Sequence, residues 1–416
     1  MSQAGTVIVV GGGFIGLWSA WYLRRQGWRV TVIDRRTIGS GCSQDNCGLV
    51  CPSHVLPLTE PGAFQAALKA LLTPHSSFRI QPRLDPALWS WLWNFSRRCH
   101  RSHMLSAAHA IQALLASGMR EYLQWLNEEQ MECEWQAVGL LYVYQSEAEL
   151  ERYAATNRLL AEHFNEPAQL LTAQQTLELE PALRDSVAGS WYYEHDAHLR
   201  PDRLIAWLRQ RLGDDGVEFI ENCQIDAVHG CGSQAQRLST SQGEMPTDAV
   251  LFACGAWSPQ LQGLIGCKLP IQPGKGYSIT MPRPQCCPRL PLIFPETRVV
   301  ATPMHSGYRL GSIMEFAGYD DSIRPERLQL LRSGAEPYLK EPYCQPELSH
   351  WFGWRPMTYD SLPIIDRTPR WGNAWIATGH NMLGLSMGPA TGRLIAELMQ
   401  GTTPHVDPTP YSVSRF

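Results

Sequence analysis

The sequence has no uninterrupted apolar run of the roughly 18 residues that a membrane-spanning helix needs. It also has no basic stripe, and with a net charge of −4 it gives no electrostatic reason to expect binding to nucleic acid. The N-terminus carries neither a charged leader nor a cleavable apolar segment, so we expect no export and a cytoplasmic location. With 44% hydrophobic and 18% charged residues, the composition is that of an ordinary folded protein.

The twelve cysteines include no CxxC pair of the kind that binds zinc. Cys42, Cys47 and Cys51 form the one tight cluster, and Cys286 and Cys287 are adjacent, but neither spacing matches the usual iron–sulfur patterns. We therefore expect reduced structural thiols and no metal site, in preference to a metal or cluster role.

What the sequence does contain is a strand, a glycine turn, a helix, a second strand and an acidic residue in succession near its start. The β-branched run 7–10 suits a strand buried on both faces. Gly11 permits a tight turn, Gly13 lets the backbone approach a pyrophosphate, and Gly16 lets the helix pack close to the strand. Asp34 ends the second strand, where it can accept hydrogen bonds from a ribose. The pattern favours a dinucleotide site at the helix N-terminus over a glycine turn without a ligand.

At 416 residues the chain is long enough for two domains, and strands of the nucleotide type recur far from the first one. One covers residues 248–258, and another covers 375–380 and leads into a helix over 388–400. A nicotinamide-binding domain usually occupies one continuous half of a chain, so this spread favours a flavin. The last helix could direct its N-terminus at the pyrimidine edge of the reduced ring.

The remaining segments are predicted to build a second domain. A long helix is expected over 106–130, and short alternating strands over 270–319 suit an antiparallel sheet that carries a substrate pocket. Residues 63–100 are broken by proline and rich in tryptophan, including Trp89, Trp91 and Trp93. These tryptophans either pack inside the second domain, which we favour, or dock on a membrane or a partner subunit.

Several motifs together resemble the D-amino acid oxidase and glycine oxidase superfamily of FAD enzymes, and within it the bacterial D-amino acid dehydrogenases. The motifs that carry the resemblance are the glycine turn and residues 43–48, 52–54, 253–258, 275–278, 354–360 and 378–380. The resemblance implies an α/β fold with an FAD-binding, Rossmann-like domain of the glutathione-reductase type, built from residues 1–60, 190–258 and 350–416. Residues 61–189 and 259–349 would form an α+β substrate domain with a mixed, largely antiparallel sheet.

The motifs and the resemblance also imply which residues contact the cofactor. The expected set is Gly11, Gly13, Phe14, Ile15, Gly16, Asp34, Arg35, Ser43, Asn46, Cys47, Gly48, Gly255, Trp257, Gly379, Met382, Leu383, Gly384 and Leu385. Sarcosine oxidases of this superfamily carry a cysteine bonded to FAD where this chain has Gly353. We therefore expect noncovalent FAD.

Arg355 is the residue that the resemblance assigns to the substrate carboxylate, and a planar guanidinium suits that task because it holds a carboxylate at two points. The alternative is a structural arginine paired with Asp360 or Glu315. Tyr277 is expected to orient the carboxylate or the amine. His54 and His380 are candidates for the pocket near the ring, with hydrogen-bonded structural roles as the alternative.

The implied reaction is oxidation of the Cα–N bond of a small D-amino or cyclic imino acid, with hydride passing to flavin N5. Glycine oxidases carry a second arginine where this chain has Met382, which leaves room for a bulkier or cyclic substrate. Quinone, oxygen or another subunit could accept the electrons, and the chain could contact the inner face of the membrane or form a homo- or hetero-oligomer. Two other interpretations stay open: the flavin subunit of a hydroxyproline, opine or cyanide-forming glycine oxidoreductase, and a nonenzymatic FAD-binding scaffold.

Overall fold

The first of two large sheets gathers strands from three distant parts of the chain. In the computed structural model, which describes residues 5–71 and 76–416, this sheet has six strands in the order β19-β20-β13-β1-β2-β9. All neighbours are parallel except β19 and β20. The strands are β1 (Thr6–Val10), β2 (Arg29–Ile33), β9 (Glu218–Ile220), β13 (Ala249–Phe252), β19 (Ile364–Arg367) and β20 (Ala374–Thr378). The prediction of a nucleotide sheet assembled from distant segments is confirmed.

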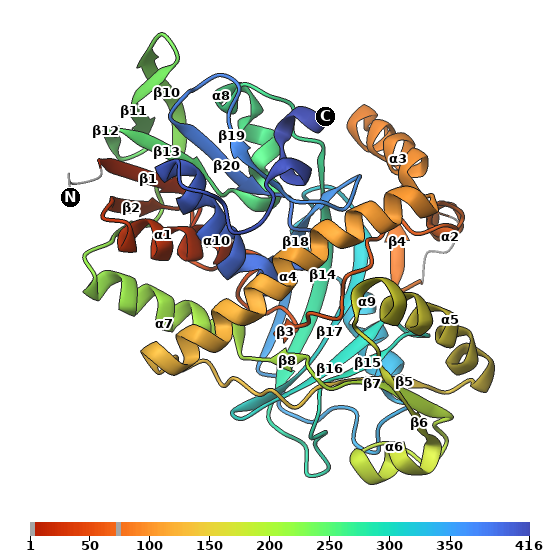
Figure 1. Cartoon of the computed structure of the whole chain (residues 1–416). Helices are drawn as coiled ribbons and strands as arrows, with labels where there is room; N and C mark the ends of the chain where they lie inside the picture. The colour runs from red at the N-terminus through yellow and green to blue at the C-terminus, as the bar shows by residue number, and fades with distance from the viewer. Residues whose placement is uncertain (1–4, 72–75) are drawn as a thin grey trace.

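Side chains alternate between the two faces of β1, and each face meets a different layer. Val7 and Val9 pack in a core with the helices α1 (Phe14–Arg25), α7 (Pro201–Asp214) and α10 (Gly384–Gln400), whereas Ile8 and Val10 pack in another. A small antiparallel sheet covers that second face, formed by β10 (Ile225–Cys231), β11 (Gln234–Thr240) and β12 (Gly243–Pro246). Helices, sheet and small sheet form three layers at the upper left of Figure 1.

The second large sheet is mixed and has nine strands, in the order β18-β14-β17-β16-β15-β5-β7-β6, with β4 paired to β17. Its position beside the first sheet is visible in Figure 1. The predicted domain boundaries placed residues 190–258 and 350–416 with the nucleotide sheet, but β7 and most of β18 pair here instead. The strands are β4 (Phe78–Ile80), β5 (Leu140–Tyr144), β6 (Gln169–Thr172), β7 (Gly189–Tyr193), β14 (Ile271–Met281), β15 (Leu292–Phe294), β16 (Val299–Met304), β17 (Gly307–Phe316) and β18 (Ser349–Thr358). A two-stranded ladder joins β3 (Leu49–Val50) to β8 (Ala197–His198).

The helix at the end of the chain begins at Gly384, one turn before the predicted start at Gly388. Pro389 lies inside this helix, although proline is usually found in the first turn. The proline nitrogen cannot donate to the carbonyl of Leu385, and the hydroxyl of Tyr122 donates to that carbonyl instead, at 2.9 Å. Tyr122 belongs to α4 (Arg101–Glu129), which crosses α10 and begins five residues before the predicted helix.

The tryptophan-rich segment divides between packing and exposure. It forms α2 (Ala63–Leu71) and α3 (Pro86–Arg98), and Trp91 of α3 is buried in a core with Phe95. Trp89 and Trp93 are 45% and 65% exposed. The packing interpretation therefore holds for Trp91 alone. The remaining helices are α5 (Glu147–Phe164), α6 (Ala173–Leu179), α8 (Gln262–Ile265) and α9 (Pro325–Ala335). Within residues 5–71 and 76–416, no helix has the length and apolar character needed to cross a bilayer.

Candidate active site

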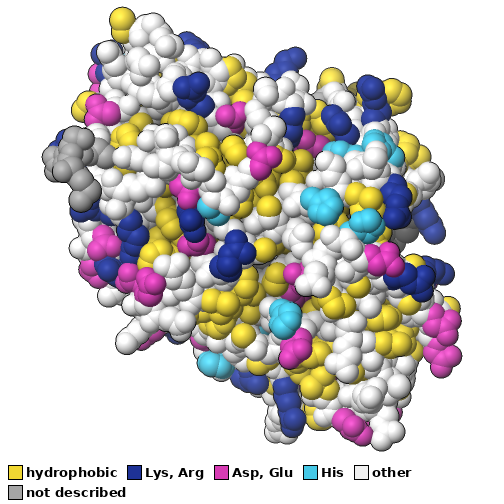
Figure 2. Space-filling view, viewed as in Figure 1, with side chains coloured by type: hydrophobic (Ala, Val, Ile, Leu, Met, Phe, Trp, Pro, Cys, Tyr) yellow, Lys and Arg dark blue, Asp and Glu magenta, His cyan; other side chains and the backbone are white. Residues whose placement is uncertain are grey.

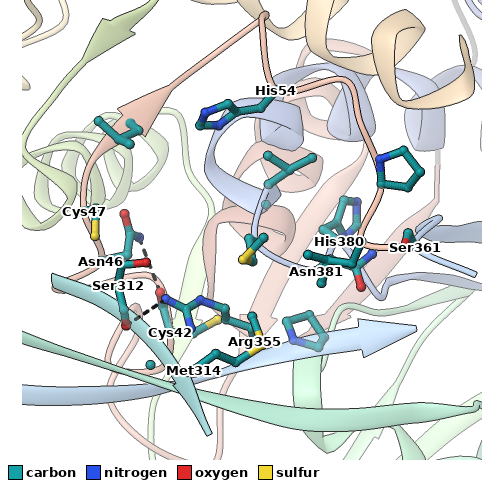
Figure 3. Close-up of a pocket in the computed structure, with 18 of the residues that line it drawn as sticks. Cys42, Asn46, Cys47, His54, Ser312, Met314, Arg355, Ser361, His380 and Asn381 are labelled. Carbon is teal, nitrogen blue, oxygen red and sulfur yellow. Dashed lines mark hydrogen bonds between the residues drawn. The ribbon is translucent and has the colours of Figure 1, made fainter. Parts of the chain in front are cut away.

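A cavity of about 870 Å³ opens between the two large sheets. Its walls come from the N-terminus of α1, the loop before β3, one face of the nine-stranded sheet and the N-terminus of α10. Figure 3 shows that residues from these separate segments converge on one space. Most of the lining is apolar, which is typical of a cofactor or small-molecule site that holds a few placed polar groups.

The glycine turn has the geometry that a diphosphate requires. Gly11 has φ +111°, and a Cβ there would lie 2.5 Å from the carbonyl oxygen of Ala253, so only glycine fits. Gly13, Phe14 and Ile15 line the cavity where α1 begins. The first turn of α1 contains no acidic residue of its own, so the positive end of the helix can attract an anion in the cavity.

Asp34 and its neighbours lie outside the large cavity. The Asp34 carboxylate accepts hydrogen bonds from the backbone N–H groups of Gly12 at 2.8 Å and Arg36 at 2.9 Å. Burial raises the pKa of Asp34, and these two N–H groups oppose that rise. The guanidinium of Arg35 lies 4.5 Å from the ring of Trp257, which lines a second cavity of about 170 Å³. Asp34, predicted to contact the ribose of the adenosine half, and the predicted cofactor residues Arg35 and Trp257 thus form a group outside the large cavity.

The far wall of the large cavity consists of residues from the last part of the chain. Gly379, with φ +76°, follows β20 directly, and Met382, Leu383, Gly384 and Leu385 line the cavity around the first turn of α10. That turn has no acidic residue either. Two helices whose first turns hold no acidic residue, and a glycine turn in which no Cβ would fit, suit FAD, because its diphosphate and its reduced ring both carry negative charge.

The guanidinium of Arg355 is the main cation on the sheet wall of the cavity. It extends from β18 and donates to the carbonyl oxygens of Ile313 at 2.8 Å and Ser312 at 3.3 Å on β17 (Figure 3). Burial lowers the pKa of Arg355, but a guanidinium stays protonated in proteins. A partly buried guanidinium whose hydrogen-bond partners are carbonyls can also bind a carboxylate from a ligand.

The alternative structural pairing of Arg355 is wrong. Asp360 pairs with Arg415 at 2.7 Å, and the contacts of Glu315 are with Arg79, Arg324, Arg327 and Tyr277. In the described part of the chain, no carboxylate lies within ion-pair distance of Arg355. The guanidinium of Arg355 is therefore without an anionic partner among the described residues, and its hydrogen-bond acceptors are the two carbonyls of β17.

Tyr277 lines the cavity, but its hydroxyl group is directed elsewhere. It donates to Glu315 at 2.8 Å. Tyr277 follows Gly276 on β14, and neighbouring residues of a strand point to opposite faces, so Tyr277 faces away from the guanidinium that lies against Gly276. This placement corrects the expectation that its hydroxyl orients the substrate beside Arg355.

Both predicted histidines line the cavity, and each is hydrogen-bonded. His54 Nε2 lies 2.6 Å from the hydroxyl of Tyr142, and His380 Nε2 lies 2.9 Å from that of Thr391. Burial lowers the pKa of His54 to about 4 and that of His380 to about 3. Both imidazoles are therefore neutral at neutral pH and add no positive charge next to a bound amine.

One buried acid near the cavity was missed at the sequence level. Asp196 accepts hydrogen bonds from the hydroxyl of Ser53 at 2.5 Å and its N–H at 3.2 Å. Burial raises the pKa of Asp196 to about 7, although these bonds oppose the rise. Ser53 belongs to one of the family motifs, but its partner lies 143 residues away, and no local pattern reveals such a pairing.

The cysteine cluster is divided around the site. Cys42 and Cys47 line the cavity, whereas Cys51 is buried behind it. Burial raises the pKa of all three thiols, and Arg355 opposes that rise for Cys42 and Cys47. Among the described residues, no group of His, Cys, Asp or Glu side chains has the arrangement of a metal site.

The structure brings most of the predicted site residues together. Those that line the large cavity are Gly13, Phe14, Ile15, Ser43, Asn46, Cys47, Gly48, His54, Gly255, Tyr277, Arg355, His380, Met382, Leu383, Gly384 and Leu385. Gly11, Gly16 and Gly379 shape the turns behind this lining, because a Cβ at each would lie within 2.7 Å of another residue. Asp34, Arg35 and Trp257 form the separate group described above.

A nucleotide sheet with a glycine turn, joined to a second sheet that presents an arginine to the cavity between them, is the arrangement of a flavin-dependent oxidoreductase. The chain belongs to the DAO family of FAD dependent oxidoreductases, whose model matches residues 6–398. It is similar to a D-amino acid dehydrogenase of Paramagnetospirillum magneticum, with 31% identity over 99% of this chain and 98% of that protein. A D-amino acid dehydrogenase of Vibrio atlanticus is 29% identical over 99% of both chains.

Solved structures support the fold. A glycine oxidase from Bacillus cereus has a TM-score of 0.76 and 19% identity, with 97% of each chain covered. An L-proline dehydrogenase from P. horikoshii has a TM-score of 0.73 and 20% identity, covering 100% of this chain and 98% of that one. The predicted family, fold class and cofactor FAD are confirmed.

Proposed function

We propose that this enzyme oxidises the Cα–N bond of a D-amino acid or cyclic imino acid to an imine. The observation that carries the proposal is the partly buried guanidinium of Arg355, which lines the cavity with no carboxylate partner in the described part of the chain. The likeness to D-amino acid dehydrogenases along the whole chain supports the D configuration.

The roles of the residues follow from their charges. Arg355 binds the substrate carboxylate through two N–H groups and so fixes the α-carbon in the cavity. The neutral imidazoles of His54 and His380 do not repel a substrate amine and do not compete for its carboxylate. The apolar lining excludes water from the reacting carbon, and the imine hydrolyses to a keto acid in water unless it is cyclic.

FAD, when bound, supplies the hydride acceptor. The turn at Gly11 and Gly13 and the N-terminus of α1 would hold its diphosphate, and the group at Asp34 would hold its adenosine half. The N-terminus of α10, with Gly384 and Leu385, would face the ring. We expect noncovalent attachment because the resemblance to sarcosine oxidases aligns their FAD-bonded cysteine with Gly353, which has no side chain that could bond to FAD.

The tryptophan-rich surface supports a quinone in a membrane as the electron acceptor. One side of α3 lines the cavity with Trp91, Leu92 and Phe95, and the other exposes Trp89 and Trp93. Arg97 and Arg98 at the end of α3 and Arg101 at the start of α4 make the adjoining surface basic. Figure 2 shows basic and histidine side chains beside hydrophobic ones in this region. Exposed tryptophans with a basic rim suit an anionic bilayer.

The test is to mix the purified FAD-loaded protein with each candidate substrate without oxygen. Reduction of the flavin by a substrate is monitored as a loss of flavin absorbance. The panel contains D-amino acids with their L-enantiomers, D-proline, hydroxyproline isomers, sarcosine and opines, with oxygen or a quinone analogue added afterwards. Stereoselective bleaching by a D-amino or imino acid is expected. Bleaching by no compound, or only when further subunits are present, contradicts the proposal and favours a scaffold or a subunit of a larger oxidoreductase.

A further inference from the structure

A second arginine lines the same cavity and has a fixed backbone. Arg298 ends the turn between β15 and β16, with φ +58° in the left-handed region. Its N–H donates to the carbonyl of Phe294 at 2.7 Å, and its carbonyl accepts from Ile313 N–H at 3.3 Å. These two bonds fix the backbone of the turn, so the point from which the Arg298 side chain leaves the cavity wall is defined.

The charged end of Arg298 has no anionic partner in the described residues. Its guanidinium carbon lies 5.4 Å from the ring of Phe78, and no carboxylate lies within ion-pair distance. Arg298 is an exposed residue at the cavity wall, and partial desolvation there lowers its pKa. Glu60 also lines the cavity, but no ion pair joins it to Arg298 in the described part of the chain.

Arg298 and Arg355 are joined through one residue of β17. Ile313 accepts a hydrogen bond at its carbonyl from the guanidinium of Arg355, and its N–H donates to the backbone carbonyl of Arg298. Adjacent strands lie about 5 Å apart, so the two arginines flank a single strand of the cavity wall. A compact ligand with two carboxylates could contact both.

We propose that Arg298 forms a second anion subsite and that the substrate is an amino acid with two carboxylates. This inference rests on the proposed function: Arg355 takes the α-carboxylate, and Arg298 takes the other one. The second carboxylate can belong to the side chain, as in D-glutamate, or to a substituent on the nitrogen, as in iminodiacetate. Both present the same chemistry to a guanidinium.

The test compares matched charged and neutral substrates. Flavin reduction is measured with D-glutamate against D-glutamine, and with iminodiacetate against its monoamide, for the wild type, Arg298→Gln and Arg298→Lys. We expect the wild type to prefer one dicarboxylate by about tenfold or more, Arg298→Gln to lose that preference, and Arg298→Lys to keep part of it. The pair that shows the preference identifies the source of the carboxylate. Arg152→Gln is the control, because the side chain of Arg152 is exposed on α5 and does not line the cavity. This variant should behave as the wild type.

A binding measurement separates failure of the subsite from failure of the function. Glutarate and butyrate are compared as ligands of the FAD-loaded protein by thermal stabilisation and by the flavin spectrum. If no amino acid reduces the flavin but glutarate binds better than butyrate only when Arg298 is present, the proposed function fails and the subsite stands. Equal binding of both acids, or an equal loss of both in Arg298→Gln, overturns the subsite.

Discussion

Gly276 lies directly against the guanidinium of Arg355: a Cβ at position 276 would be 2.5 Å from the Cζ atom of that arginine. The two residues are on neighbouring strands, β14 and β18. Because Gly276 has no side chain, the Arg355 side chain has room to cross β14 and reach the carbonyls of β17. The position of the proposed carboxylate anchor thus depends on a glycine.

Replacing Gly276 with alanine should displace Arg355 and weaken substrate binding. We expect KM to rise by about tenfold or more while FAD content stays unchanged, because the guanidinium must leave one or both carbonyl partners. Steady-state kinetics and flavin absorbance measure both quantities. Gly213→Ala in α7 is a matched control, since a Cβ there meets nothing within 4 Å. An unchanged KM in Gly276→Ala would show that the arginine does not bind substrate.

The charge-conserving change Arg355→Lys tests whether the substrate carboxylate is held at two points by the planar guanidinium group. An ammonium cannot make the paired contacts of a guanidinium, so kcat/KM should fall by about a hundredfold despite the retained charge. Arg415→Lys is the control for the effect of replacing any partly buried arginine with lysine. Arg415 lies away from the cavity, and a lysine there can still pair with Asp360. The prediction fails if the lysine variant retains the activity of the wild type.

Asp34 should contribute to FAD affinity without affecting the reaction. Asp34→Asn removes the charge from the carboxylate that we assign to the ribose, so the Kd for FAD should rise by about 10- to 100-fold. Fluorescence titration of the apoprotein measures it, with Asp226→Asn on the exposed strand β10 as the control. At saturating FAD, kcat should match that of the wild type; a lowered kcat would place Asp34 closer to the chemistry than we propose.

The buried acid near the cavity predicts a pH dependence of stability. Burial raises the pKa of Asp196 from 3.8 to about 7, so the folded protein holds a proton that the unfolded chain has lost between these values. The stability that the protonated carboxyl contributes is complete below the lower value and is lost as the pH rises through about 7.

Asp196→Asn keeps a hydrogen bond to Ser53 but cannot ionise. Its melting temperature should exceed that of the wild type by roughly 1–4 °C at about pH 8, and the difference should shrink toward about pH 5. Thermal unfolding of the FAD-loaded proteins measures this. A constant difference across the pH range would mean that Asp196 does not titrate there.

The exposed face of α3 should mediate membrane contact. Changing both Trp89 and Trp93 to glutamine should lower binding to vesicles of phosphatidylcholine with about 30% phosphatidylglycerol severalfold in a flotation assay. Leu170→Gln, an exposed apolar residue on β6, is the control. Reduction of a soluble quinone analogue should be unchanged. If all variants float with the vesicles to the same extent, the exposed tryptophans of α3 do not mediate membrane binding, and the proposal of a membrane quinone as acceptor loses its support.

The parts of the site that the sequence revealed are those encoded by local patterns. The turn from Gly11 to Gly16 follows from a strand, a helix and an acid in register, and the family motif around Arg355 pointed to an arginine that lines the cavity. Pairings between distant residues were not visible: Ser53 with Asp196, and Arg298 with Ile313, depend on strand order and register. The direction of the Tyr277 side chain was also mispredicted. Every residue of β14 is buried, so its sequence has no polar–apolar alternation that would show which side chains face the cavity.

The cavity is walled by both ends of the chain, and this has a consequence for biosynthesis. The turn at Gly13 is made early, but β20 and the N-terminus of α10, near Gly384, complete the opposite wall. A ribosome-bound chain that stops short of these elements has the phosphate-binding turn without the surface that would face the flavin ring. FAD should therefore be captured only after synthesis is nearly finished, and truncations before α10 should yield colourless protein.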